Sequence, residues 1–455
     1  MLKCINPATG QVIERVQCDD RRTVHEKFQK LQEGHDKWRQ RPRQERVRLI
    51  ERFGKLLEKR QEEQARGLTR EVGKPIRQAR REVEQARRQV GALVAHERER
   101  MDRDASSGRP SQRKRVECTP LGVVAHISTW DFPVLAGIQM MLPALLAGNS
   151  VMYKPSAHAT LVGRLLVGTM REAGLPKGAV DMVVGAGAVG DYLLDEAISG
   201  LVFSGSYATG RNVCEKIASR MIPRHMELKS KDGIYVCDDV EEEWVAGKIA
   251  GQAMYNAGQS RGTVERIYVH RAAYHRIVQA LCRCVSAHKL GSPDQEATSV
   301  GPLASKQQVN ALEYQIGDAL QKGAQILTGG RVDGGKGNFF QPTVLVDTDH
   351  RMLVMREDTL GPVLCVQSVA DDDEALQRLE DTDYGVTAAV FSQSRSRACT
   401  LLGELDVDQV YWNGYHGACP PIATDGQYYS GPSSDTSRPA MHWFTRAKSW
   451  RLPPS

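Results

Sequence analysis

The 455-residue sequence lacks the marks of several protein classes. Its ten cysteines show neither C-x-x-C spacing nor neighbouring histidines, which argues against a metal site or a disulfide framework and favours reduced thiols in the cytoplasm. No stripe of one charge sign occurs, because 61 Lys and Arg are mixed with 55 Asp and Glu. The resulting net charge of +6 does not indicate a nucleic-acid surface.

Long apolar runs are also scarce. The longest, residues 132–148, is interrupted by Gln139 and Pro143, so it predicts a buried helix and not a membrane span. The first residues, MLKCINPATG, carry no apolar core of a secretory signal. We therefore expect a cytoplasmic protein that does not enter a membrane.

The length and a hydrophobic content of 41% are sufficient for two or three domains. From Arg21 to about Arg103, apolar residues recur at helical spacing, which predicts two or three amphipathic helices. Short apolar strands then alternate with helices, beginning with LGVVAHIS, NSVMYKPS and AVDMVVG. This alternation predicts a parallel, doubly wound sheet, and a second alternating series from about Met226 predicts a second α/β domain.

Two glycine-containing turns could hold a phosphate. A G-x-G-x-x-G pattern follows the strand AVDMVVG, at Gly185, Gly187 and Gly190, but glycines at such a turn often serve the backbone alone. In FSGSYATG, Gly205 and Ser206 open a helix whose free N–H groups could bind a diphosphate. An ordinary helix cap explains the same residues equally well.

Seven short motifs occur in a fixed order along the chain: TWDFP (129–133), YKPS (153–156), FSGS (203–206), EL (227–228), NAGQS (256–260), LGP (360–362) and a late VYWN. In this order they resemble the aldehyde dehydrogenase superfamily, from INPATG to FTRAKSW. The matching family motifs read P-W-N-F-P, K-P-S, F-T-G-S, E-L-G-G-K, G-Q-x-C and E-x-F-G-P.

The resemblance implies an aldehyde dehydrogenase-like α/β fold with three parts. Residues 1–225 would form N-terminal helices and a Rossmann-type dinucleotide-binding domain with an arm at about 104–119. Residues 226–409 would form a catalytic-type α/β domain, and residues 410–455 a tunnel loop and oligomerisation tail.

The positions that perform chemistry in the family depart from its pattern. Glu227 keeps the position of the base, but the nucleophilic cysteine is replaced by Arg261, which cannot form a covalent adduct. Asp131 stands where the family has an oxyanion-binding Asn, and a carboxylate would repel the oxyanion. Lys229 and Ser230 replace two glycines. Cys419, in the late loop, has no flanking base and is interpreted as a bystander.

The cofactor positions that the resemblance implies are mixed. The ribose-binding acid after K-P-S is Ala157, and the acid of E-x-F-G-P is Asp358. The resemblance therefore permits either NAD or NADP as the cofactor. It leaves three alternatives for the affinity, which is retained, weakened or lost. The candidate cofactor-binding residues are Trp130, Lys154, Gly187, Phe203, Gly205, Ser206, Leu228 and Asp358.

These departures gather at one centre and predict a pseudoenzyme with a binding, regulatory or assembly role. One alternative is an oxidoreductase that acts on aldehydes with NAD(P). Another is an enzyme with altered, non-covalent chemistry that uses Glu227 and Arg261. We also expect Arg261 to bridge Asp131 or Glu227, or else to bind a small anionic ligand. The expected partners are a second copy in a homodimer or homotetramer, or an active relative in a hetero-oligomer.

Overall fold

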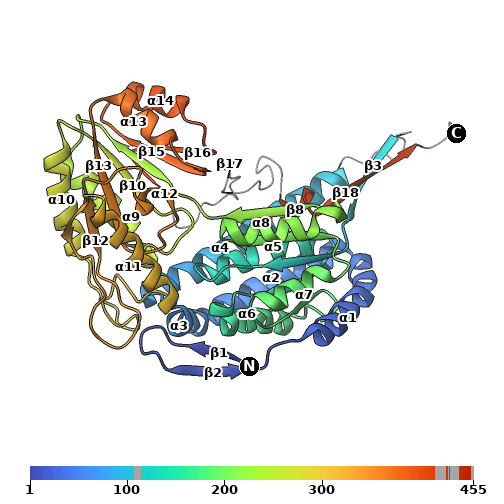
Figure 1. The fold of residues 1–455 in the computed structure, drawn as a ribbon. Helices are drawn as coiled ribbons and strands as arrows, with labels where there is room; N and C mark the ends of the chain where they lie inside the picture. The colour runs from blue at the N-terminus through green and yellow to red at the C-terminus, as the bar shows by residue number, and fades with distance from the viewer. Residues whose placement is uncertain (107–113, 416–426, 429, 431–439, 452–455) are drawn as a thin grey trace.

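The computed structural model describes residues 1–106, 114–415, 427–428, 430 and 440–451. Two α/β units lie side by side, each around its own sheet, and a two-stranded ribbon projects from one of them (Figure 1). The doubly wound cofactor-type unit and the second α/β unit that the sequence predicts are therefore confirmed.

The first sheet has five parallel strands in the order β6-β5-β4-β7-β8. The chain runs outward from β4 to β6 and then returns to add β7 on the other side of β4. The strand order thus reverses between β4 and β7, and in open α/β sheets ligands bind beyond the carboxyl ends of the strands at such a point. The strands are β4 (Val123–Ile127), β5 (Ser150–Lys154), β6 (Val180–Met182), β7 (Gly200–Gly205) and β8 (Arg224–Leu228).

Helices cover both faces of this sheet. One hydrophobic core joins one face to α2–α6, and another joins the opposite face to α1, α7 and α8. The helices are α1 (Arg21–Gln40), α2 (Arg43–Lys59), α3 (Gln61–Val72), α4 (Ile76–Ser106), α5 (Pro133–Leu146), α6 (Thr160–Glu172), α7 (Gly187–Asp195) and α8 (Tyr207–Ile217).

The N-terminal region contains four helices, α1–α4, and not the two or three that the sequence predicts. Pro42 separates α1 from α2, and α3 ends at Gly73, whose left-handed φ of 82° stops a helix. In the G-x-G-x-x-G pattern, α7 begins at Gly187, so Gly190 lies inside the helix.

The apolar run at 132–148 forms α5, in which Pro143 is accommodated and nearly every residue is buried. It packs against the sheet and α4, as predicted for a core helix. Within the described residues, no helix has both the length and the apolar character needed to cross a membrane.

The second sheet has seven strands in the order β11-β12-β13-β10-β9-β15-β16, and only the edge strand β11 runs antiparallel. Its strands are β9 (Gly233–Val236), β10 (Arg266–His270), β11 (Gln325–Thr328), β12 (Thr343–Val346), β13 (Val363–Val369), β15 (Thr387–Phe391) and β16 (Gln409–Trp412). Its helices are α9 (Glu242–Ala253), α10 (Tyr274–Ser286), α11 (Lys306–Gln321), α12 (Leu353–Arg356), α13 (Asp372–Glu380) and α14 (Arg395–Glu404).

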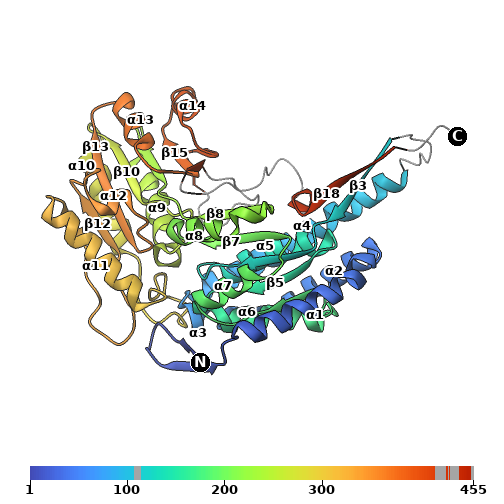
Figure 2. The same cartoon turned by 45° about the vertical axis from the view of Figure 1, so that its right-hand side comes forward.

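Three small ribbons complete the fold. β1 (Leu2–Ile5) pairs with β2 (Val12–Val16), and β14 (Tyr384–Gly385) pairs with β17 (Gln427–Tyr428). β3 (Lys114–Pro120) pairs antiparallel with β18 (Thr445–Arg451), and this ribbon extends away from both sheets (Figure 2). Residues 107–113 of the predicted arm lie outside the described residues, and the predicted boundaries at 225 and 409 stay predictions.

Candidate functional site

The candidate site lies where the two α/β units meet. β8 ends at Leu228, and residues 229–232 lead directly into β9 at Gly233. The loop after β4 contributes Asp131, and the turn before β10 contributes Arg261. Segments that are far apart in the sequence therefore converge around residues 227–232.

The turn that precedes Arg261 has an unusual backbone. Asn256, Ala257 and Gly258 all have positive φ, of 52°, 55° and 70°. A Cβ on Gly258 would lie 2.0 Å from the Gly361 carbonyl oxygen, so NAGQS and LGP pack backbone against backbone. Non-glycine residues with positive φ are strained and persist only where their surroundings hold them. This turn therefore fixes the position of residue 261.

Side-chain hydrogen bonds hold the turn in place. The Asn256 amide donates to the Asp131 carbonyl at 3.1 Å and to the Gln259 carbonyl at 2.7 Å. Gln259 donates to the Asn256 carbonyl at 3.0 Å and accepts from the Ala304 N–H at 2.8 Å. The loops after β4 and before β10 are thus joined as one unit.

Arg261 does not bridge the two carboxylates, so this expectation was wrong. Its Nε donates to the Leu228 carbonyl at 2.6 Å, and one terminal nitrogen donates to the Ser430 carbonyl at 3.4 Å. The half-buried guanidinium therefore joins the end of β8 to the C-terminal segment. Asp131 and Glu227 take their hydrogen bonds and ion pairs from other residues, so Arg261 acts on Glu227 only through its charge.

Glu227 is held by neighbours on its own sheet. The Ser204 hydroxyl donates to it at 2.9 Å from the paired position on β7, and His225 Nε2 lies 3.2 Å from its other oxygen. Burial alone would raise the pKa of Glu227, but His225, the Arg261 charge and Ser204 together lower it to about 2. Such a carboxylate is a weak proton acceptor near neutral pH.

Asp131 is paired with Lys229. Lys229 Nζ lies 3.6 Å from one carboxylate oxygen, and the Thr129 hydroxyl donates to the other at 2.7 Å. Burial raises the pKa of Asp131, but Lys229, Thr129 and Lys74 outweigh it, and the pKa is lowered. Lys74 also donates to the Asp131 carbonyl at 2.7 Å and forms a buried ion pair with Glu82. Asp131 is therefore a paired anion and does not act as a hydrogen-bond donor.

Asp358 extends this set of buried charges. Burial raises its pKa to about 7, Lys229 and Lys231 oppose the rise, and Glu265 and Asp131 add to it. One carboxylate oxygen of Asp358 has no hydrogen-bond partner. Lys231 is bound to Glu265 and donates to the Thr359 hydroxyl at 2.7 Å. A network of alternating charges thus occupies the contact between the two sheets.

The candidate cofactor positions gather at the carboxyl edge of the first sheet. Lys154 ends β5, and burial lowers its pKa to about 8; its one hydrogen bond within the described residues is a long one, 3.5 Å to the Pro155 carbonyl. Gly187 and Ser206 are exposed at the starts of α7 and α8. Trp130 is half-buried beside Lys229, whose Nζ lies 5.9 Å from its ring centre.

Other predicted cofactor residues shape the edge without offering polar side chains. A Cβ on Gly205 would lie 2.7 Å from the Phe203 ring, so Gly205 is required for packing at the end of β7. Leu228 is buried against Gly210 of α8. The Ser206 hydroxyl accepts from the Thr209 N–H at 3.3 Å, so Ser206 acts as a helix cap for α8.

None of the nine described cysteines lies on the loops that build this site. Burial raises the pKa values of the thiols of Cys4, Cys237 and Cys365 to about 12, so these thiols are poor nucleophiles. Cys419 lies outside the described residues. Among the described residues, no group of three or more His, Cys, Asp and Glu side chains could hold a metal ion.

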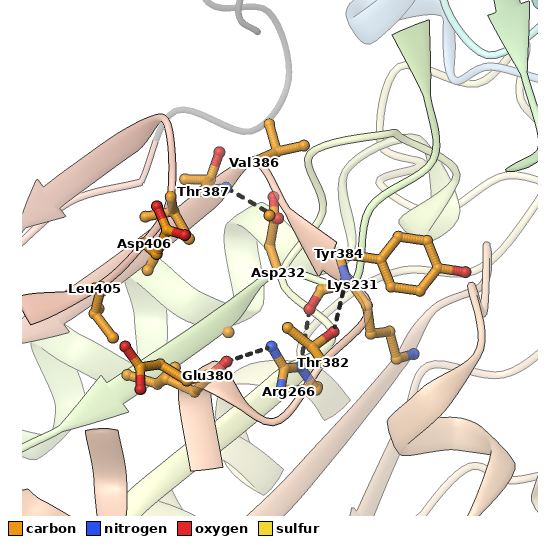
Figure 3. Close-up of a pocket in the computed structure, with 15 residues that line it drawn as sticks. Lys231, Asp232, Arg266, Glu380, Thr382, Tyr384, Val386, Thr387, Leu405 and Asp406 are labelled. Atoms are coloured by element: carbon orange, nitrogen blue, oxygen red, sulfur yellow. Dashed lines mark hydrogen bonds between the residues drawn. The ribbon is translucent and has the colours of Figure 1, made fainter. Parts of the chain in front are cut away.

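A cavity of about 310 Å³ opens at the amino-terminal ends of β9, β10 and β15 (Figure 3). Buried Arg266 lines it and donates to the carbonyls of Arg378 and Leu379 at 3.0 and 3.1 Å, so its cation caps the C-terminus of α13. Asp232 accepts from the Tyr415 hydroxyl at 2.7 Å and from the Thr387 N–H at 3.1 Å. These wall charges are satisfied within the protein.

Several residues of the site do not stand out in the sequence. His225 lies two positions before Glu227 on β8, and the alternation of a strand, which places both on one face, could have revealed it. Ser204 becomes a partner of Glu227 only through the pairing of β7 with β8. Lys74, between α3 and α4, and Asn256, in the turn before β10, both donate to the Asp131 carbonyl. Both are far from Asp131 in the sequence, so local patterns do not show these contacts.

Comparisons with known proteins give one consistent result. A family profile described as "Aldehyde dehydrogenase family" matches residues 1–450. The mitochondrial aldehyde dehydrogenase of Leishmania tarentolae is 31% identical over 336 residues, covering 73% of this chain and 68% of that protein. Succinate semialdehyde dehydrogenase [NAD(P)+] Sad of Escherichia coli K12 is 26% identical, with 97% of this chain and 95% of that protein covered.

The structural comparison gives the same result. The solved structure of 3,6-anhydro-L-galactose dehydrogenase in complex with NAP superimposes with a TM-score of 0.91. The two proteins are 25% identical, and the match covers 99% of this chain and 96% of that one. The whole arrangement of both sheets is therefore shared.

Proposed function

Because the chain belongs to the aldehyde dehydrogenase family, we propose that it is a member that does not carry out the cysteine-dependent, NAD(P)-linked oxidation of aldehydes and has a binding, regulatory or assembly role. The observation that carries this proposal is Arg261. It stands on the rigid turn where the family's nucleophile is expected, and it is engaged with two main-chain carbonyls.

The other positions of the inherited centre support the same proposal. Glu227 has a pKa of about 2, which is too low for an efficient general base near neutral pH. Asp131 is an anion where an oxyanion would need a hydrogen-bond donor. Three separate requirements of the family reaction are thus unmet by the residues at hand.

The residues fit a dinucleotide in part. The exposed starts of α7 and α8, at Gly187 and Ser206, suit a diphosphate, and Lys154 offers a cation with one weak contact. The unpartnered oxygen of Asp358 could accept a ribose hydroxyl. NAD or NADP would supply a hydride acceptor there. Lys229 places a buried cation beside Trp130. We therefore expect a weakened affinity for the dinucleotide.

A second candidate function is favoured by the relatives. One relative is named for activity with NAD(P)+, and one structural neighbour is described as a complex with NAP. An NAD(P)-linked aldehyde oxidoreductase would need a nucleophile other than residue 261. An enzyme with altered, non-covalent chemistry that uses Glu227 and Arg261 would need no nucleophile. We rank both below the first proposal, because they leave Asp131 and Lys229 unexplained.

The test measures binding and turnover separately. Purified protein is titrated with NAD and with NADP while its thermal unfolding is followed, and a panel of aldehydes is then assayed for reduced cofactor. A shift without turnover supports a cofactor-binding pseudoenzyme, and the absence of both supports an assembly role. Thiol-dependent oxidation of aldehydes at a substantial rate would overturn the proposal.

The variant Arg261→Cys sharpens this test. Alone it should not restore turnover, because Asp131 still opposes an oxyanion and Lys229 still occupies the centre. The matched control is the triple variant Asp131→Asn, Lys229→Gly, Arg261→Cys, which removes these obstacles together. Turnover by Arg261→Cys alone would show that the other two positions do not block the reaction.

The remaining expectations belong to the same proposal. We propose a homodimer or homotetramer, because the β3–β18 ribbon projects from the subunit and has two strands in the described part of the chain. A hetero-oligomer with an active relative and a small anionic ligand near Arg261 stay proposals, as does a cytoplasmic location.

A further inference from the structure

The cavity at the amino-terminal ends of β9, β10 and β15 is not used by the proposed function (Figure 3). Its volume of about 310 Å³ suits a small organic molecule, because the ligand sites of proteins begin near this size. Glu380 and Asp406 are exposed and Val407 is half-buried, so these residues mark the mouth of the cavity. Its wall also includes Lys231 and Asp232, which connect the candidate site to β9.

Buried Arg266 offers this cavity an unused hydrogen-bond donor. Its Nε donates to the Lys231 carbonyl at 2.8 Å, and Nη1 donates to the Tyr268 hydroxyl at 2.9 Å and the Arg378 carbonyl at 3.0 Å. Nη2, which carries two N–H groups, donates only to the Leu379 carbonyl, at 3.1 Å, among the described residues. One N–H of a side chain that is 2% exposed thus lacks a protein acceptor, and leaving it unpaired costs free energy.

The start of β9 leaves space beside this donor. Gly233 lines the cavity, and a Cβ on this residue would lie 3.3 Å from Arg266 Nη2 and 2.6 Å from Leu379 Cδ2. A side chain at position 233 would therefore fill the space next to the guanidinium. The bare glycine leaves room for an oxygen atom of a ligand to reach Nη2.

Carboxylates accompany this cation in the wall of the cavity (Figure 3). Asp232 is buried, and Glu380, at the end of α13, is exposed. The Glu380 side chain makes no hydrogen bond or ion pair with another described residue. Inorganic phosphate or a dicarboxylate would be repelled by these charges, whereas a simple amine would leave the Arg266 N–H without an acceptor. The wall therefore favours a ligand that carries one charge of each sign.

Much of the remaining wall is apolar. Val386, Leu379 and Leu405 are buried, and half-buried Val407 lies at the mouth. An aliphatic group gains free energy when it leaves water for such surroundings. The cavity thus combines a buried cation, an exposed anion at its mouth and an aliphatic wall.

We propose that this cavity binds a neutral α-amino acid with an aliphatic side chain of the size of leucine. The ligand carboxylate accepts from the unused N–H of Arg266, and the ammonium group lies beside Glu380. The aliphatic side chain packs against Leu379 and Leu405. Binding is reversible and changes no covalent bond. The inference goes beyond the proposed function and does not depend on whether the protein turns over aldehydes.

The test is isothermal titration calorimetry of the full-length protein with three probes. These are L-leucine, isocaproate, which lacks the ammonium group, and isopentylamine, which lacks the carboxylate. We expect L-leucine to bind at least about tenfold more tightly than either analogue, because each analogue loses one charge-assisted hydrogen bond. The proposal is overturned if L-leucine does not bind, or if its advantage over either analogue is smaller than about tenfold.

Two variants assign the binding to this cavity. Glu380→Gln should weaken the binding of L-leucine about fivefold without changing that of isocaproate, because it removes only the charge that faces the ammonium group. Glu313→Gln, at an exposed site on α11, is the matched control and should change neither. Gly233→Ala should abolish binding of L-leucine, because its Cβ fills the space beside Nη2. Binding of L-leucine that Glu380→Gln leaves unchanged would overturn the proposal even if Gly233→Ala does not fold.

Discussion

At the scale of single residues, the charged side chains of the candidate site pair differently from the bridge that we expected Arg261 to make. Asp131 pairs with Lys229, Glu227 with His225 and Ser204, and Arg261 with backbone carbonyls. Buried charges are tolerated when each has hydrogen bonds or an opposite charge, and breaking one such pair is costly. This arrangement lowers the pKa of Glu227, whereas burial raises the pKa of Asp358. Both shifts can be tested.

Glu227→Gln should lower stability at neutral pH but not in acid. The folded pKa of about 2 lies below the usual value of 4.5 for a glutamate, so the ionised carboxylate stabilises the fold above about pH 4.5. This contribution, on the order of 3 kcal/mol, is lost as the pH falls toward 2. Thermal unfolding of wild type and variant between about pH 7 and pH 3 measures it. An unfolding-temperature gap that stays constant over this range would contradict the pKa.

Asp358→Asn should have the opposite pH dependence. The folded pKa of about 7 lies above the usual value of 3.8 for an aspartate, so ionisation of Asp358 weakens the fold as the pH rises through this interval. The variant should therefore unfold at a higher temperature than wild type at about pH 8, with a smaller difference at about pH 5. If instead the variant is less stable at about pH 8, then Asp358 is stabilised as an anion.

At the scale of elements, the turn before β10 depends on its contact with LGP. Three successive residues with positive φ are held where Gly258 meets the Gly361 carbonyl. Strain of this kind persists at sites that need a fixed side-chain position. The turn therefore holds the backbone of residues 256–258 in one conformation just before Arg261.

Gly258→Ala should destabilise the protein by at least about 2 kcal/mol, because a new Cβ combines left-handed strain with a backbone clash. The matched control is Gly247→Ala on the exposed face of α9, where nothing lies within 4 Å of the new Cβ. It should stabilise the protein by about 0.5–1 kcal/mol. Chemical denaturation of both variants compares them, and equal effects would show that the contact with Gly361 is not tight.

At the scale of the whole molecule, two features have no further paired strand among the residues that the structure describes. The β3–β18 ribbon has two strands there, and such a ribbon is marginally stable in water on its own. β16 ends the seven-stranded sheet, with Val410 and Trp412 exposed by 45% and 40%. Exposed sheet edges of this kind pair with other chains unless they are protected.

The protein should therefore be a dimer or larger in solution, with at least twice the subunit mass of 50.4 kDa. Val410→Lys places a charge on the β16 edge and should shift the protein toward monomer. Tyr314→Lys, at an exposed site on α11, is the control and should leave the assembly unchanged. Light scattering coupled to size-exclusion chromatography measures both, and a wild-type monomer would refute the expectation.

The order of many elements and the candidate site positions could be predicted from the sequence alone. Apolar runs and glycine turns are local signals, so they predicted strands in each sheet, the buried helix α5 and the motifs that carry Asp131, Glu227 and Arg261, but not β16, which lies in the predicted tail. The sequence missed the division of the N-terminal region into four helices, because helical periodicity continues across Pro42 and Gly73.

Only the tertiary structure decided which charges meet. Arg261 was expected to join Asp131 or Glu227, yet Lys229 reaches the first, and His225 with Ser204 reaches the second. Sheet register and the close packing of distant loops choose these partners, and neither is encoded in local spacing. The residue types thus predicted which positions form the candidate site, whereas the fold placed Lys229 beside Asp131.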